Sequence, residues 1–145
     1  MLKNILRTVF ALIFFSCTAH ASFTAPYPKD WTHIRTLGDY KVYHKETYTN
    51  LVNVGGEKRL NTWAKYVARD TKPNLFQMRK DDYVLVQLQF ICSTRQYAII
   101  SGTTYFSKGG QPRASVVDEP QFTRIQSNSI ESRIANRVCS QQYRA

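Results

Sequence analysis

The stretch that decides the fold is Tyr83–Cys92, with the sequence YVLVQLQFIC. Every second position carries an apolar side chain, namely Val84, Val86, Leu88, Phe90 and Cys92. Gln87 and Gln89 lie between them and fall on the other face of an extended chain. The alternation predicts a β-strand with one face toward a core and one wetter face, and it places Cys92 on the core face.

Turn signals divide the neighbouring sequence into further short strands. Gly38-Asp39 suits a tight hairpin turn between two segments rich in β-branched and aromatic residues, and Gly55-Gly56 marks the next reversal. The expected strands span residues 32–37, 40–47, 58–69, 83–92 and 96–106, with short apolar pieces at Val116-Val117 and Phe122. The sequence thus predicts a single antiparallel sheet of about six strands.

The hydrophobic period changes near the C-terminal end of the sequence. Apolar side chains recur there every four residues, at Ile130, Ile134 and Val138. This spacing predicts an amphipathic helix with Cys139 on its buried stripe. Asn128, followed three residues later by Glu131, resembles a capping box at the helix start. Packing the helix on the sheet gives an α+β domain in which Cys92 and Cys139 approach each other from opposite layers.

The first 21 residues have the layout of a cleaved signal peptide. Lys3 and Arg7 precede an uncharged apolar run, and Ala19-His20-Ala21 resembles a cleavage site. The apolar run is too short for a helix that spans a bilayer, and no transmembrane segment is expected in the mature chain. The expected organisation is therefore a signal peptide at 1–21 and one folded domain at 22–145.

Cys17 offers a rival interpretation, because a cysteine after the apolar run can become the lipidated first residue of an exported lipoprotein. The preceding Phe14-Phe15-Ser16 lacks the usual leucine, so cleavage before Ser22 is favoured over a lipid anchor. Under both interpretations the protein is exported, and its expected location is the cell surface, the outer membrane or the periplasm.

Cys92 and Cys139 are the other two cysteines of the chain once Cys17 is removed or lipidated. In an oxidising compartment two such cysteines are expected to form a disulfide. The expected bridge would close a long loop and fasten the terminal helix to the apolar face of the strand at 83–92.

A set of short motifs is spread along nearly all of the mature chain. The motifs are Asp30-Trp31, Tyr43, Gly55-Gly56, Thr62-Trp63-Ala64-Lys65, Phe90-Ile91-Cys92, Arg95-Gln96-Tyr97, Tyr105 and Val138-Cys139. In combination they resemble the surface-adhesin protein E family of Gram-negative bacteria. The resemblance implies an exported antiparallel sheet with a C-terminal helix and two corresponding cysteines. It also implies an adhesin-like role in attachment to host extracellular-matrix proteins.

Two histidines of the first expected hairpin deserve comparison with catalytic and metal sites. A turn centred on Gly38-Asp39 would place His33 directly opposite His44, with Trp31 and Glu46 as the next pair on that face. Two imidazoles and a carboxylate are weak candidates for a metal site, and two histidines can act as acid and base on a phosphodiester. The favoured interpretation is a half-exposed hairpin face of polar residues, with no cofactor, metal or catalytic residue.

Basic and aromatic side chains gather around the long strand expected at 58–69. The candidate ligand-binding residues are Lys58, Arg59, Trp63, Lys65, Tyr66 and Arg69. The whole chain has 20 Lys and Arg against 10 Asp and Glu, a formal net charge of +10. Such a surface favours acidic partners and salt-dependent affinity. Nucleic acid is disfavoured, because acidic residues interrupt the run and an exported protein meets little nucleic acid.

The sequence therefore predicts a noncatalytic cell-envelope or surface protein, adhesin-like, that recognises an extracellular macromolecule. The expected partner is a host matrix protein or an acidic glycan, bound through the basic and aromatic surface. Two alternatives stay open at this point: a periplasmic accessory protein that binds another envelope component, and a small secreted hydrolase that uses His33 and His44. A homodimer is also compatible with the sequence.

Overall fold

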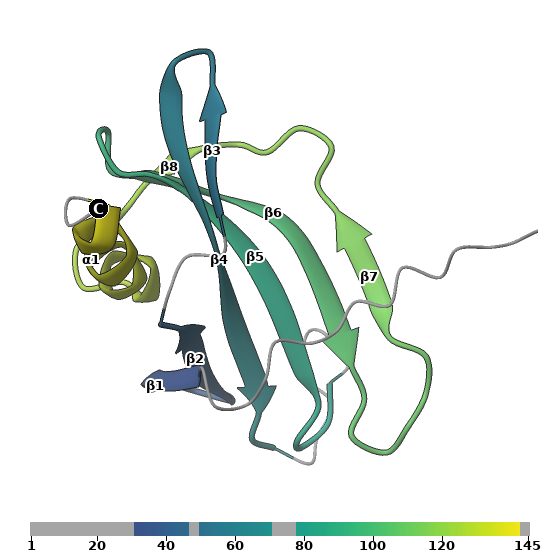
Figure 1. The fold of residues 1–145 in the computed structure, drawn as a ribbon. Coiled ribbons are helices and arrows are strands. Elements are labelled where there is room, and N and C mark those ends of the chain that lie inside the picture. The colour runs from purple at the N-terminus through teal and green to yellow at the C-terminus, as the bar shows by residue number, and fades with distance from the viewer. Residues whose placement is uncertain (1–30, 47–49, 71–77, 143–145) are drawn as a thin grey trace, which may run out of the picture.

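The computed structural model describes residues 31–46, 50–70 and 78–142. Within these ranges the protein forms one antiparallel sheet of eight strands and one helix (Figure 1). The elements are β1 (Trp31–Leu37), β2 (Tyr40–Lys45), β3 (Asn50–Val54), β4 (Glu57–Ala68), β5 (Tyr83–Ile91), β6 (Gln96–Tyr105), β7 (Arg113–Val116), β8 (Thr123–Arg124) and α1 (Ile130–Gln142). The expected signal peptide at 1–21, with Cys17, lies outside the described residues.

The sheet has more strands than the sequence predicted. Its main path runs β1-β2-β4-β5-β6-β7, while β3 pairs with β4 and β8 pairs with β6. The prediction of about six strands was wrong because β3 and β8 carry no apolar alternation, and almost all of their side chains are exposed. Gly55 and Gly56 connect β3 to β4 with φ angles of 58° and 85°, a conformation that favours glycine.

The core lies between α1 and one face of the sheet, so the architecture is mainly β with a single covering helix. β4 pairs Leu60 with Phe90 and Thr62 with Leu88 on β5, and all four side chains are buried. The helix adds Ile130, Ile134, Ala135 and Val138 to this core. In Figure 1, α1 lies toward the left edge of the sheet, and the edge strand β7 lies at the right. The helix therefore covers only part of the face on which it packs.

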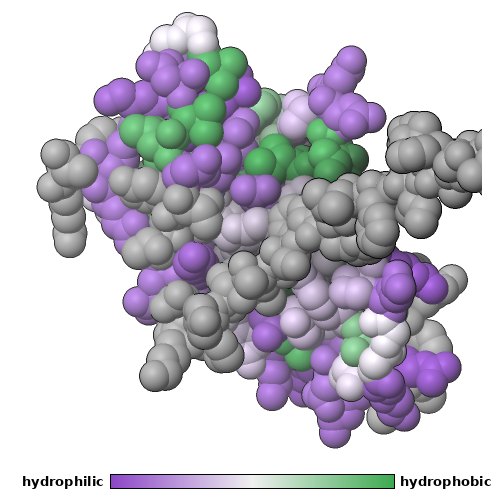
Figure 2. Space-filling view, turned by 45° about the vertical axis from the view of Figure 1, so that its right-hand side comes forward, coloured by the Kyte–Doolittle hydropathy of each residue, from purple (hydrophilic) through white to green (hydrophobic). Residues whose placement is uncertain are grey.

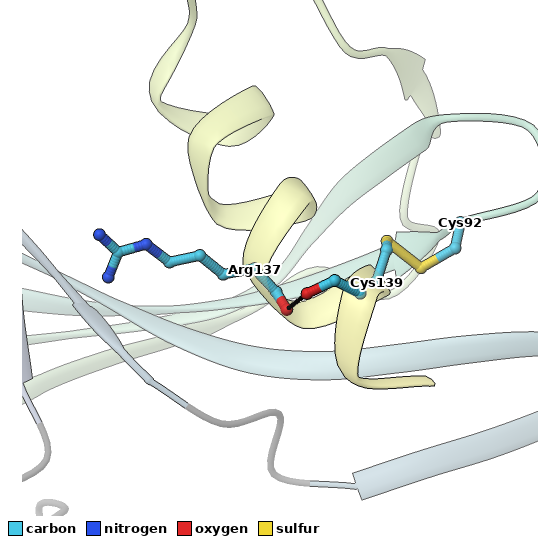
Figure 3. Close-up of a disulfide and its surroundings, with 4 residues drawn as sticks. Cys92, Arg137 and Cys139 are labelled. Carbon is cyan, nitrogen blue, oxygen red and sulfur yellow. Dashed lines mark hydrogen bonds between the residues drawn. A yellow bond between two sulfur atoms is a disulfide. The ribbon is translucent and has the colours of Figure 1, made fainter. Parts of the chain in front are cut away.

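The predicted disulfide is confirmed. Cys92, directly after β5, is bonded to Cys139 on α1, with their Cα atoms 5.7 Å apart and 47 positions apart in the sequence. Figure 3 shows the bridge between the helix and the end of the strand, with Arg137 extending away from it. Because the sulfurs come from the two layers of the fold, the bridge clamps the helix to the sheet.

The start of α1 differs from the expected capping box. The Oγ atom of Ser129 accepts a hydrogen bond from the backbone N–H of Ser132 at 3.0 Å, which makes Ser129 the N-cap. Asn128 precedes it with a φ of 62° and forms the bend before the helix. The assignment of Asn128 and Glu131 as the cap was therefore one residue early, because asparagine is also favoured where the backbone turns with positive φ.

Candidate functional site

The two faces of the sheet differ in chemistry. We call the face that packs against α1 the helix-side face, and the opposite one the far face. Residues paired across antiparallel strands share a face. One such row on the far face runs through His33, Tyr43, Lys65, Leu85 and Thr103, on β1, β2, β4, β5 and β6. The far face is thus built by side chains from at least five strands.

The long strand β4 divides the candidate ligand-binding residues between the two faces. Arg59, Trp63 and Lys65 are separated by even numbers of positions and point to the far face. Lys58 and Tyr66 occupy the other set of positions and point to the helix-side face. The structure therefore brings three of the six candidates together on one face and separates two others from them.

Arg69, the sixth candidate, lies just after β4 and fastens a turn. Its guanidinium NH1 donates a hydrogen bond to the carbonyl oxygen of Gly38 at 3.1 Å. Its backbone N–H donates to the carbonyl oxygen of Asp39 at 2.8 Å. These contacts hold the β1–β2 turn against the end of β4, so Arg69 has a structural role in the described fold.

Lys65 forms the centre of a cation–aromatic group on the far face. Its Nζ atom lies 4.2 Å from the ring centroid of Tyr83, and Tyr83 stacks on Tyr105 with centroids 4.9 Å apart. Burial lowers the pKa of Lys65, and burial together with Tyr105 raises the pKa of Tyr83. A lysine held over an aromatic ring is positioned by that ring's quadrupole, so its charge has a defined place on the surface.

Asp82 fixes the two tyrosine-bearing strands at their ends. Its carboxylate accepts hydrogen bonds from the backbone N–H of Arg79 at 2.9 Å and of Ser107 at 2.8 Å, and from the Ser107 hydroxyl at 2.9 Å. Burial alone would raise the pKa of Asp82, but these hydrogen bonds lower it overall. Since Asp82 precedes β5 and Ser107 follows β6, the network holds the ends that carry Tyr83 and Tyr105.

Arg59 is held in place at the other end of β4. Its Nε atom lies 2.8 Å from Oε1 of Glu57, and its guanidinium carbon lies 4.8 Å from the ring centroid of Phe122. Its NH1 donates to Oε1 of Gln89 at 3.4 Å, and Gln89 in turn donates to Oδ1 of Asn61 at 2.8 Å. A partly exposed ion pair of this kind stabilises the fold by at most about 1 kcal/mol, so Arg59 can exchange Glu57 for an external anion.

The first hairpin does not pair the two histidines as expected. A β-bulge between His33 and Arg35 adds a residue to β1, so His33 pairs with Tyr43 and His44 pairs with Thr32. A shift of one residue moves side chains to the opposite face. His33 and His44 therefore lie on opposite faces, and the prediction that they stand opposite each other was wrong.

The remaining members of the suggested metal site are also separated. Trp31 pairs with Lys45, and Glu46 follows the end of β2, where its carboxylate accepts a hydrogen bond from the hydroxyl of Thr32. The carbonyl oxygen of Glu46 accepts from Nε2 of Gln141 at 2.8 Å. In the part of the chain that the structure describes, no three His, Cys, Asp or Glu side chains gather as a metal site would require.

His44 is a core residue. Its side chain is 0% exposed, and its Nε2 lies 3.5 Å from the hydroxyl oxygen of Thr62. Its buried Nδ1 has no hydrogen-bond partner within the described ranges. Burial, and then the charge of Arg137, lower the pKa of His44 to about 4, against the opposing effect of Glu46. The imidazole is therefore neutral at pH 7 and sealed from solvent.

A groove that the sequence did not indicate lies on the helix-side face. It has a volume of about 430 Å³, and Tyr66, Val84, Val86, Ile99 and Val117 contribute its larger side chains. Tyr66, expected on the basic surface, instead lines this groove, and burial, followed by Glu131 and Tyr97, raises its pKa. The signal that would have pointed to it is a glycine inside a strand otherwise rich in β-formers, at 96–106. We call this feature the helix-side groove.

Comparison with known proteins adds no relative: no family model, curated protein or solved structure matches the chain. No helix among the described residues is both long enough and apolar enough to cross a membrane. What the geometry defines is a sheet clamped to one helix by a disulfide. Lys65, Tyr83 and Tyr105 form a group on its far face, where Leu85 and Thr103 are buried, and an apolar groove lies on the other face.

Proposed function

We propose that this chain is a noncatalytic, exported cell-envelope or surface protein, of the surface-adhesin protein E type, that binds an acidic extracellular glycan through its far face. The observation that carries the proposal is the alignment of Arg59, Trp63 and Lys65 on one face of β4, with Tyr83 and Tyr105 stacked beside Lys65. Cations pair with sulfate or carboxylate groups, and the ring of Tyr83, which contacts both Lys65 and Tyr105, holds the lysine charge in place.

The remaining chemistry of the described residues supports binding rather than catalysis. Cys92 and Cys139 are joined to each other, so neither is a free nucleophile. His44 is buried and His33 lies on the other face, so the acid–base pair of the hydrolase alternative is not assembled. A rigid face without a nucleophile beside a base suits recognition of a ligand.

Lys58 and Lys65, on opposite faces of β4, provide a matched test of the far face. We expect Lys65→Gln to weaken binding to immobilised heparin about fivefold at low salt, because about 1 kcal/mol of charge interaction is lost. Lys58→Gln removes the same charge from the same strand on the other face, and we expect less than about a twofold change. Heparin affinity measured at several salt concentrations checks both values. Equal effects of the two substitutions would remove the far face from the proposal.

The location of the protein separates surface adhesion from a periplasmic accessory role. The signal-peptide layout and the disulfide support export. We expect protease added to intact cells to cleave the protein while a periplasmic marker survives. Cleavage that requires a permeabilised outer membrane would instead support an accessory protein that binds another envelope component.

A further inference from the structure

The helix-side groove occupies the part of the sheet that α1 leaves uncovered. Its floor comes from neighbouring strands, because Tyr66 pairs with Val84, and Val86 pairs with Gly102. At its rim Ile99 is 50% exposed and Val117 is 40% exposed, values that are high for large apolar side chains. In the view of Figure 2, hydrophobic residues reach the surface in small groups set among hydrophilic ones. A concave apolar surface of this size is typical of sites for small molecules.

Gly102 is the strongest sign that the groove is kept empty for a ligand. A glycine inside a strand destabilises a fold by roughly 0.5–1 kcal/mol relative to alanine. The packing of this chain does not require it, because a Cβ atom at Gly102 would come no closer than 3.6 Å to any neighbour, the Oγ of Ser115. The missing side chain leaves space in the groove floor. A glycine inside a strand marks either a bulge or a place where another molecule approaches the strand closely. The bulge of β6 lies between Ile99 and Ser101, so Gly102 is outside it.

The lining of the groove selects against charge. None of the described residues that line it is ionised at neutral pH; besides apolar groups they offer only hydroxyls, such as those of Ser101, Thr104 and Ser115. The charges that act on its tyrosines are acidic, since Asp39 adds to the effect of burial on the pKa of Tyr40, and Glu131 does so for Tyr66. Arg113 pairs with Thr104 at one end of the groove, but its guanidinium carbon lies over the ring of Phe106, 5.3 Å from the centroid, and Arg113 does not line the groove. An anionic head group would therefore meet no cation among the lining residues, although the chain as a whole carries a net charge of +10.

The backbone of the groove floor also selects against a peptide. Tyr66, Val84 and Thr104 form one paired row, and Val86, Gly102 and Ser115 belong to the next. Their backbone groups lie in the ladders of the sheet, so an extended peptide would find no main-chain partners on the floor. A hydrocarbon chain has no hydrogen-bonding groups, so it can lie on the groove floor without leaving a donor or acceptor unpaired.

We propose that the helix-side groove binds the aliphatic chain of a small uncharged molecule. This site is distinct from the far face and goes beyond the glycan binding proposed above. The groove supplies apolar contact along the chain, and the hydroxyl groups supply neutral hydrogen-bond partners for an uncharged polar end.

The test uses the mature chain and the neutral fluorescent probe N-phenyl-1-naphthylamine. We expect a saturable rise in probe fluorescence that 1-decanol reverses. We expect decanoate to be at least about tenfold weaker as a competitor, since none of the lining residues offers its carboxylate a cation. Exclusion of the probe from the unmodified chain, whether by a second copy or by residues outside the described ranges, would overturn the proposal. Equal competition by decanoate would overturn the assignment of an uncharged ligand.

Three substitutions tie the probe to the groove. Gly102→Val fills the floor, and we expect it to weaken probe binding at least about tenfold while heparin binding stays unchanged. Ile99→Ser removes an apolar rim side chain, with an expected loss of about fivefold. Val116→Ser is the matched control, because Val116 is 74% exposed on the neighbouring strand but does not line the groove.

The variants also distinguish failure of the site from failure to fold. Should Gly102→Val not fold, Ile99→Ser and the smaller Gly102→Ala still report on the groove, since a Cβ at position 102 makes only ordinary contacts. Probe binding that is insensitive to Ile99→Ser and to both Gly102 variants would place the probe elsewhere and end the proposal.

Discussion

Replacing both Cys92 and Cys139 with alanine is expected to lower the free energy of unfolding by about 4 kcal/mol and the melting temperature by roughly 15 °C or more. The bridge spans 47 positions, so its loss gives the unfolded chain a large gain in conformational entropy. The same change releases α1 from the sheet, and the helix contributes four buried apolar residues to the core. Urea unfolding of the oxidised wild type and the double variant measures the difference.

Reduction provides the control for the cysteine variants. Wild type in dithiothreitol should unfold at nearly the same urea concentration as the double variant, because both lack the bridge while keeping side chains of similar size. Each single variant should behave like the double one, since one sulfur alone closes no loop. A difference of less than about 1 kcal/mol between oxidised wild type and the double variant would contradict this role of the bridge.

Acidification is expected to destabilise the protein through His44. The pKa of His44 is about 4 in the folded protein and 6.5 in the reference state, so the unfolded chain takes up the proton first as the pH falls. The stability that depends on the neutral imidazole is complete above pH 6.5 and is lost progressively toward pH 4. The loss between about pH 7.5 and about pH 4.5 is on the order of 2 to 3 kcal/mol from this group.

Replacement of His44 by leucine should remove this loss. His44→Leu keeps an apolar side chain of similar size in the core and takes away the buried Nδ1 that lacks a partner among the described residues. We expect similar stability to wild type at about pH 7.5 and a shallower decline toward about pH 4.5, measured by urea unfolding at each pH. His33→Leu is the control, because His33 is exposed. Parallel pH profiles of wild type and His44→Leu would contradict the assignment.

The parts of the fold that were predicted correctly have a regular spacing of apolar residues. The alternation at residues 83–92 predicted a strand with Phe90 toward the core, and the four-residue spacing after residue 128 predicted α1. Cys92 and Cys139 fell on these two apolar patterns, and the bridge between them follows. Such patterns predict the structure well because burial of one continuous apolar face outweighs the intrinsic conformational preferences of single residues.

Two predictions about the strands were wrong because they depend on how neighbouring strands pair. The bulge beside His33 has no glycine or proline to mark it, and its single extra residue moves His33 to the face opposite His44. β3 forms by pairing with the exposed end of β4, a tertiary effect that leaves no apolar period in its own residues. Local patterns cannot contain such information, since it depends on the neighbouring strand.

Of the two candidate binding surfaces, one was predicted in part from the sequence and the other was missed. Arg59, Trp63 and Lys65 were predicted as ligand-binding residues, and strand alternation explains why they share a face that Lys58 and Tyr66 do not. The helix-side groove was missed because it depends on how far α1 extends across the sheet, which no residue pattern reveals. Gly102 was the one local indication of the groove, because it is a glycine within a strand at a position where a Cβ atom would make only ordinary contacts.

The order of the bridged cysteines along the chain has a consequence for biogenesis. Polypeptides are made from the N-terminal end, and Cys139 follows the eight described strands, so the strands are made before the second sulfur of the bridge. Oxidation then favours chains with the native packing, because a disulfide requires Cα atoms about 4.4–6.8 Å apart and the packing of α1 on the sheet brings those of Cys92 and Cys139 to 5.7 Å. We expect chains in which the two cysteines are held apart to keep free thiols, which remain open to thiol–disulfide exchange.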